Sequence, residues 1–352
     1  MFSSLPFNYM FLIVMGVGTL FSVSSLHWLG IWAGLSNNLI GFFTLFGVPK
    51  KIMKKSISCK MFVVQAIGSS FLIFGSLLVY NMSFTWESVN NMYNTSILGL
   101  IMMVSGLSVK LGLFPFYFWL PSVMAGLPWI TCLLLATWQK LGPIFLMISL
   151  LELSNSYWLI IIMCIMSSGS ALMGGLGGMN QTQVRALLAY SSIGHLGWML
   201  FALIHGEWVM KTYLLIYILI SMCMFMSLWY SNSSIMKNFN NLKNSGFVQL
   251  SIMLMLLSLG GLPPLLGFIS KWLVIMAGVT SPYLSFLFLL ILGSLMSLFY
   301  YLSLFFSLIL ENMKGYSIVD YNSNFSSLLL IIILFNMLGG MLILFVNSLS
   351  VV

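Results

Sequence analysis

Charged residues are scarce in this sequence. Lys, Arg, Asp and Glu make up 5% of its 352 residues, whereas soluble globular domains carry about 25%. An ordinary soluble domain is therefore excluded. Acidic residues number only five. All of them fall in predicted loops, so the sequence offers no argument for a flavin or nicotinamide site.

Residues that bind metals and phosphates are also few. The three histidines cannot ligate two bis-histidine haems, and the four cysteines include no CxxC pair, so no metal site or disulfide framework is indicated. Segment 174–178 is glycine-rich but lacks a following Gly-Lys-Ser/Thr, so it is not a phosphate-binding loop. We expect it to let helices approach closely. With Arg185 as the only arginine, no Arg-rich presequence is expected.

The chain has long apolar runs instead. Hydrophobic residues make up 61% of it, the mean hydropathy is +1.08, and residues 1–49 and 272–310 carry no formal charge. Such lengths suit helices of about 20 residues that cross a hydrocarbon core about 30 Å thick. The pattern predicts an all-α, polytopic membrane protein with about eleven transmembrane helices. They are expected near residues 5–25, 27–47, 58–80, 95–118, 122–150, 156–177, 184–204, 210–230, 246–270, 272–308 and 325–349. The fifth and tenth are too long for straight spans and should bend or tilt.

The few charges follow this topology. The net charge is +8, but five lysines crowd one predicted loop (Lys50, Lys51, Lys54, Lys55 and Lys60), which favours a positive-inside signal over nucleic-acid binding. Loops after the even-numbered spans carry most of the cations, and loops after the odd-numbered spans carry Glu87, Glu152 and Glu207, with Lys211 as their only cation. The N-terminus is then expected on the positive side and the C-terminus on the opposite side.

Two spans are interrupted by proline and glycine. One interruption is Lys110-Leu-Gly-Leu-Phe-Pro115, and the other is Gly260-Gly-Leu-Pro-Pro-Leu-Leu-Gly267, which Lys271 follows. A broken helix frees carbonyls that must face protein or a water-filled cavity. Two such spans, five apart in order, indicate discontinuous helices in inverted repeats. We expect one transmembrane domain, 1–352, with repeats at about 5–150 and 156–308 and an extra C-terminal helix.

Lys110, Lys140 and Lys271 are the leading candidates for chemistry. An ionisable residue at bilayer depth is costly and is functional by default. Burial favours the neutral form of an amine, which lets it exchange a proton. The alternative is that these lysines snorkel to an interface or cap helix ends. His195, expected in mid-span, could relay protons, or it could be a hydrogen-bonded core residue.

Several short segments resemble subunit 2 of the mitochondrial NADH dehydrogenase family (respiratory complex I). They include Trp28-Leu-Gly-Ile-Trp-Ala-Gly34, Thr137-Trp-Gln-Lys-Leu-Gly-Pro143, Ser191-Ser-Ile-Gly-His-Leu-Gly-Trp198 and Leu259-Gly-Gly-Leu-Pro-Pro-Leu-Leu-Gly-Phe268. The resemblance covers nearly the whole chain. It implies an antiporter-like membrane-arm subunit of a proton-translocating NADH:ubiquinone reductase, in the mitochondrial inner membrane with its lysine-rich side facing the matrix.

The resemblance also assigns roles to residues and partners. Lys110, Lys140 and Lys271 match the family's central proton axis, and His195 lies along it. NADH, FMN, the iron–sulfur clusters and ubiquinone would be bound by other subunits, so this chain is expected to bind no cofactor or metal. Its partners would be the other membrane-arm and peripheral subunits and the lipid bilayer, not nucleic acid, and it would not be a free monomer.

One position departs from the family pattern. The family has a glutamate after Trp-x-Gly-Leu, which pairs with the lysine matched by Lys110, whereas this chain has Ser36. Trp28, Trp32 and Ser36 share one helical face, so the gate position is present without its charge. Either the chain uses a modified gate or a partner chain supplies the acid.

Two other functions compete with the proton-pumping subunit. The first is an independent cation/proton antiporter with the same fold, although cation sites favour the oxygen ligands that this chain largely lacks. The second is a structural helical anchor, which leaves the intramembrane lysines and broken helices unexplained.

Overall fold

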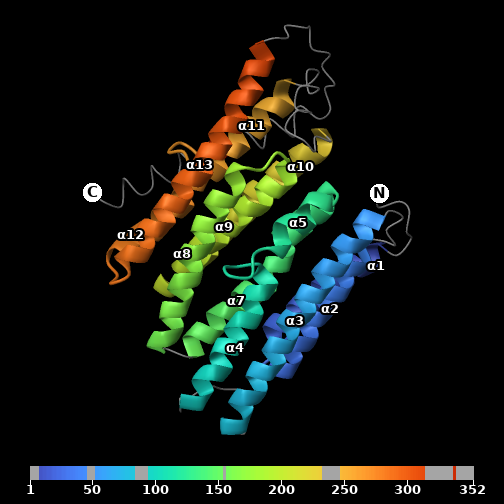
Figure 1. Ribbon diagram of the computed structural model, residues 1–352, viewed down its shortest axis with the longest axis vertical. Coiled ribbons are helices and arrows are strands. Elements are labelled where there is room, and N and C mark those ends of the chain that lie inside the picture. The colour runs from blue at the N-terminus through green and yellow to red at the C-terminus, as the bar shows by residue number, and fades with distance from the viewer. Residues whose placement is uncertain are drawn as a thin grey trace. The chain divides into compact units, whose positions relative to one another are not determined.

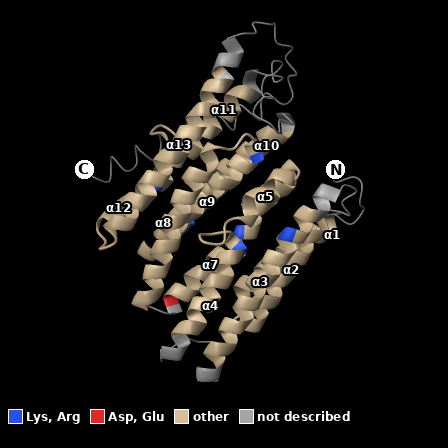
Figure 2. Cartoon of the chain, viewed as in Figure 1, with Lys and Arg blue, Asp and Glu red and all other residues tan. Residues whose placement is uncertain are grey.

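The computed structural model describes residues 8–45, 52–83, 94–153, 156–231, 246–313 and 336–337. Within these ranges the chain forms helices and no β-strand (Figure 1). The chain divides into two compact units, Met1–Met163 and Cys164–Val352. Among the described residues six helices are long and apolar enough to cross a membrane, and four shorter apolar helices accompany them. The prediction of an all-α polytopic membrane protein is confirmed, and the few charged residues are scattered over otherwise uncharged helices (Figure 2).

The first unit contains seven helices in the described ranges and the start of an eighth. They are α1 (Asn8–Ser24), α2 (Trp28–Leu45), α3 (Ile52–Ser83), α4 (Asn94–Leu111), α5 (Trp119–Gly126), α6 (Trp129–Ala136), α7 (Trp138–Leu153) and the first part of α8 (Tyr157–Met179). Helices α3 and α4 lie side by side (Figure 1). A Cβ on Gly106 would lie 2.8 Å from the carbonyl oxygen of Gly68. Glycine at this crossing therefore allows the two backbones to approach closely.

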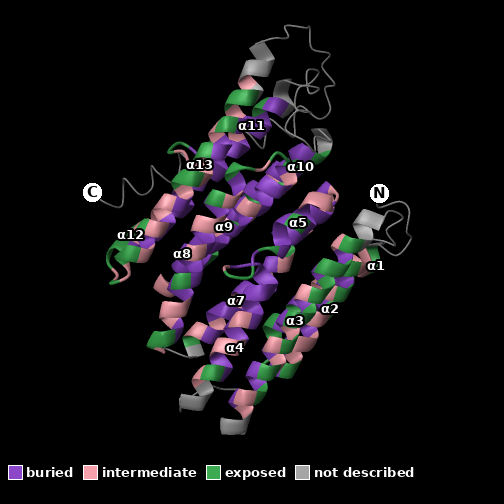
Figure 3. Ribbon diagram, viewed as in Figure 1, coloured by how far each residue is buried: buried purple, intermediate pink, exposed green. Residues whose placement is uncertain are grey.

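The second unit contains the rest of α8 and five further described helices. They are α9 (Val184–His205), α10 (Glu207–Ser231), α11 (Gly246–Gly260), α12 (Leu266–Val279) and α13 (Leu284–Met313). Helix α9 forms the core of this unit (Figure 3). Of its most apolar stretch, 83% is buried, and α10, α12 and α13 pack against it. A Cβ on Gly174 of α8 would lie 2.6 Å from the nitrogen of Gly194 in α9. The expected role of the glycine-rich segment in close helix approach is confirmed.

In each unit, one described helix ends at a left-handed glycine inside the expected apolar span. The N–H groups of Gly112 and Leu113 both donate to the carbonyl of Ser108, at 2.9 and 3.0 Å. Gly261 and Leu262 donate to Leu257 in the same way, at 3.1 and 3.3 Å. Gly112 has φ +75° and Gly261 φ +82°, a left-handed conformation that glycine adopts without steric cost. Both ends therefore have the geometry of a glycine-terminated helix, and the predicted discontinuous helices are confirmed here.

Some predicted boundaries are wrong. The fourth span ends at Leu111 rather than 118, because the glycine turn precedes Pro115. The division placed at Lys271 is also wrong, since α12 runs through Lys271 and the breaks lie at 261–265 and 280–283. The Gly-Gly-Leu-Pro-Pro segment cannot continue a helix, whereas the residues around Lys271 can.

The predicted lysine-rich loop also needs correction. Helix α3 starts at Ile52, so Lys54, Lys55 and Lys60 are helical, in keeping with the good helix propensity of lysine. The bends expected in span 122–150 are confirmed by the division into α5, α6 and α7. The predicted C-terminal helix, 325–349, lies outside the described residues except for positions 336 and 337.

Candidate functional site

In the first unit, Lys110 and Lys140 share a small cavity. Lys110 lies in the last turn of α4 and Lys140 near the start of α7. Their side chains are 8% and 4% exposed. The cavity measures about 10 Å³, which is room for about one water molecule. Its lining comprises Met61, Gln65, Lys110, Leu111, Trp119, Leu120, Leu135, Gln139 and Lys140.

The break after α4 explains how this cavity is held. The last carbonyls of a helix have no partner within it, and here two of them accept hydrogen bonds from side chains. Gln65 Nε2 donates to the carbonyl of Lys110 at 3.2 Å, and Trp119 Nε1 donates to that of Val109 at 3.1 Å. Both bonds are buried. They fix the end of α4, and with it the backbone of Lys110, against α3 and α5.

The polar lining of this cavity consists of amides, an indole and amines. Gln139 Nε2 donates to Asn38 Oδ1 at 3.0 Å, which links α7 to α2. No carboxylate belongs to the lining, which is drawn from the described residues. Ser36 is not part of it either, and its hydroxyl donates to the carbonyl of Ala33 at 2.8 Å.

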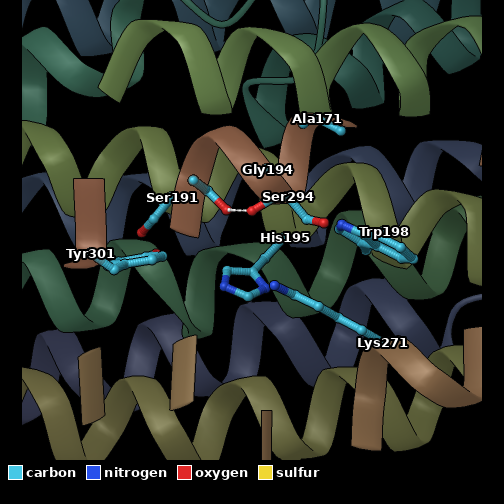
Figure 4. Close-up of a pocket in the computed structure, with 10 residues that line it drawn as sticks. Ala171, Ser191, Gly194, His195, Trp198, Lys271, Ser294 and Tyr301 are labelled. Atoms are coloured by element: carbon cyan, nitrogen blue, oxygen red, sulfur yellow. Dashed lines mark hydrogen bonds between the residues drawn. The ribbon is translucent and has the colours of Figure 1, made fainter. Parts of the chain in front are cut away.

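In the second unit, Lys271 and His195 share another cavity (Figure 4). Its volume is also about 10 Å³, and α8, α9, α12 and α13 line it. Figure 4 shows the amine of Lys271 directed toward the imidazole of His195. The lining residues are Ala171, Ser191, Gly194, His195, Trp198, Lys271, Gly293, Ser294, Ser297 and Tyr301.

The amine of Lys271 binds the end of the broken helix. Its Nζ donates to the carbonyl of Gly260 at 2.9 Å and to that of Leu259 at 3.4 Å. The C-terminus of a helix carries a partial negative charge, so an ammonium is favoured there. The helix-capping role considered for the lysines thus occurs for Lys271, at a buried break beside the cavity.

His195 is held by the neighbouring helix. Its Nδ1 lies 2.8 Å from the hydroxyl oxygen of Tyr213 in α10. The ring of Tyr217, one turn further along α10, packs with its centroid 5.3 Å from that of the imidazole. His195 lies in the middle of α9, as the sequence predicts.

The structure places the predicted site residues in two groups, Lys110 with Lys140 and His195 with Lys271. Ser36 joins neither group. Sequence reasoning missed Gln65, Gln139 and Tyr213. The signal for the two glutamines was an amide side chain inside an apolar segment. Tyr213 gave no such signal, because tyrosine is an amphipathic aromatic residue that membrane proteins also place at the bilayer interface.

Comparison with known proteins adds to this geometry. A family model described as "NADH:quinone oxidoreductase/Mrp antiporter, TM" matches residues 25–299. The NADH-ubiquinone oxidoreductase chain 2 of Anopheles gambiae is 39% identical over 333 residues, covering 92% of this chain and 93% of that one. The protein of the same name from Mus musculus is 38% identical over 294 residues, covering 83% of each.

Solved structures share the fold. A chain of respiratory complex I from Thermus thermophilus has a TM-score of 0.83 at 23% identity, over 95% of this chain and 78% of that one. A chain of an archaeal membrane-bound sulfane sulfur reductase gives 0.86 at 22% identity, over 96% and 74%. A chain of the Mrp complex from Dietzia gives 0.78 at 15% identity, over 84% and 59%.

Proposed function

Because the chain belongs to the NADH:quinone oxidoreductase/Mrp antiporter transmembrane family, we propose that it is a core membrane-arm subunit of mitochondrial NADH:ubiquinone oxidoreductase. It moves protons across the inner membrane while NADH is oxidised and ubiquinone reduced on other subunits. Those subunits bind the NADH, FMN, iron–sulfur clusters and ubiquinone, and this chain binds none of them. The lipid bilayer and the other membrane-arm and peripheral subunits are its partners.

The observation that carries this proposal is the pairing of a buried amine with a water-sized cavity beside a broken helix, once in each unit. Lys110 and Lys140 line one cavity, and Lys271 with His195 lines the other. Burial favours the neutral amine, while a water in the cavity and, for Lys271, the freed carbonyls of Leu259 and Gly260 would stabilise the ammonium. Small changes in the surroundings can therefore load or unload a proton.

The energy for transport must come from outside the chain. Moving one charge across the membrane costs about 2.3 kcal/mol per 100 mV. The proposed subunit has no redox site, so its protonation steps must be coupled to electron transfer elsewhere in the complex. NADH oxidation by the isolated chain would contradict this.

The orientation and the internal repeat are part of the proposal. The lysine-rich segment and the N-terminus face the matrix, and the C-terminus faces the intermembrane space. The repeats at about 5–150 and 156–308 are proposed to be inverted, and the shared hydrogen-bond pattern at Gly112 and Gly261 supports a repeat.

An independent cation/proton antiporter is the alternative function. The relatives named as oxidoreductase chains, 38–39% identical over most of their length, favour the complex I subunit. Mild detergent extraction followed by native electrophoresis separates the two. A complex I subunit migrates with its partners, whereas an antiporter migrates alone.

The decisive experiment measures protons pumped per NADH oxidised, in vesicles that contain the assembled complex. We expect Lys110→Met and His195→Gln each to lower this ratio or to abolish coupled turnover, because the relay loses a titratable group. Lys211→Met is the matched control, since Lys211 is an exposed lysine of α10 in an ion pair with Glu207. An unchanged ratio in assembled complexes that carry Lys110→Met would remove Lys110 from the mechanism.

A further inference from the structure

We propose that Tyr213 is a positioning residue of the proton relay, and that its hydroxyl holds the imidazole of His195 in one orientation toward the cavity of the second unit. This inference rests on the proposed function. It assigns a role to a residue of α10 that contributes nothing to the lining of the cavity.

The geometry begins with a buried hydroxyl. The side chain of Tyr213 is 1% exposed, and a buried phenol without a hydrogen-bond partner is costly. The hydroxyl bonds with His195 Nδ1, at 2.8 Å, and Ser270 of α12 is a second hydrogen-bond neighbour. Helices α9 and α10 pack against each other, so this bond is anchored on two rigid elements and not on a loop.

The chemistry of the two groups makes the bond suitable for a relay. A phenol hydroxyl is both a donor and an acceptor. The bond exists for either tautomer of the neutral ring: the Tyr213 O–H donates to Nδ1 when the ring proton is on Nε2, and Nδ1–H donates to the phenol oxygen when the proton is on Nδ1. With the proton on Nδ1, Nε2 is free to take a proton from the relay, and in the imidazolium that results Nδ1–H still donates to the phenol oxygen. The only covalent change in this step is the N–H bond formed at Nε2, as the proton's bond to its donor breaks, and broken again when the proton leaves.

The bond therefore persists through both protonation states, and the ring does not need to rotate between them. A backbone carbonyl could only accept and an ammonium could only donate. Tyr213 thus keeps the imidazole in register with the cavity that His195 and Lys271 line (Figure 4). Proton exchange there depends on this register, because a transfer step needs its donor and acceptor within hydrogen-bond reach, directly or through one water.

Tyr213→Phe tests the inference, since it removes one oxygen atom and keeps the ring. A typical hydrogen bond shifts the equilibrium between the bonded and the unbonded orientation of a side chain by a factor of roughly two to ten. We expect the proton-pumping rate to fall by about that factor in vesicles with the assembled complex. Uncoupled NADH:ubiquinone turnover and the amount of complex should change little, because packing is kept.

The matched control is Tyr300→Phe. Tyr300 is a tyrosine of α13 that is also buried, at 2% exposure, and it does not itself line the cavity. Its ring packs against that of the lining residue Tyr301, with centroids 4.6 Å apart, and phenylalanine keeps this packing. This variant should pump at the wild-type rate. Equal losses in both variants would mean that the deletion of any buried hydroxyl slows the unit, and would overturn the assignment of Tyr213.

A double variant separates positioning from a structural role. If Tyr213 acts through His195, Tyr213→Phe should have no further effect in the His195→Gln background. Additive losses would overturn the inference. The single variants also distinguish failure of the positioning role of Tyr213 from failure of the proposed function. Normal pumping in His195→Gln refutes the relay itself, whereas a defect in His195→Gln with normal pumping in Tyr213→Phe refutes only the positioning role.

Discussion

Replacement of Lys271 by methionine should abolish coupled proton transport while the complex still assembles. The two side chains have similar length, and methionine has no charge and no proton to exchange. The structure allows the stability change to be worked out, because both hydrogen bonds of the amine are defined.

Two opposing contributions decide that stability. The ammonium donates to Gly260 at 2.9 Å and to Leu259 at 3.4 Å. A hydrogen bond to a charged group contributes about 1.5–3 kcal/mol, and the longer one contributes less, so the loss totals roughly 2–4 kcal/mol. Methionine also avoids the cost of a lysine at bilayer depth, about 2.5–3.5 kcal/mol. The two contributions nearly cancel, and the net change should stay within about 2 kcal/mol.

The assay combines native electrophoresis, thermal stability of the complex, and protons pumped per NADH. We expect assembly and stability close to those of the unsubstituted complex, with pumping strongly reduced. Full proton stoichiometry in Lys271→Met would refute the relay role of this amine. Failure to assemble would refute the energetic reasoning, because Lys271 would then stabilise the break far more than two hydrogen bonds allow.

Four further outcomes are expected. Gly261→Ala should destabilise the complex by about 1–2 kcal/mol, because φ is +82° there, and should disturb pumping, because the new Cβ would lie 3.0 Å from Lys271 Nζ. Gly206→Ala, where no atom lies within 4 Å of the Cβ position, should leave the melting temperature unchanged. Gly194→Ala should slow pumping without loss of assembly, since its Cβ meets no neighbour within 4 Å but enters the lining of the cavity; a wild-type pumping rate would argue against a water step there. A C-terminal epitope should be reached by antibody in mitoplasts and not in inside-out vesicles, and the reverse would invert the proposed topology.

The sequence by itself determined the class of the protein. In a bilayer the backbone must satisfy its own hydrogen bonds, as helices and closed barrels do, and the long uncharged runs have the length of helices. Gly112 with Pro115 and Gly261 with Pro263 located both helix breaks. A glycine in the left-handed conformation that is followed by a proline cannot continue a helix. The lysines and His195 stood out because charge and imidazole are rare in apolar spans.

The tertiary structure decided how those residues group. That Lys110 shares a cavity with Lys140, that Lys271 reaches back to Gly260, and that Tyr213 binds His195 all depend on contacts between separate helices. Spacing along one helix cannot encode such contacts, because they are set by how separate helices pack. The boundary placed at Lys271 was wrong for a related reason. A lysine marks the end of a span only when its amine faces water, and here the amine is satisfied inside the fold.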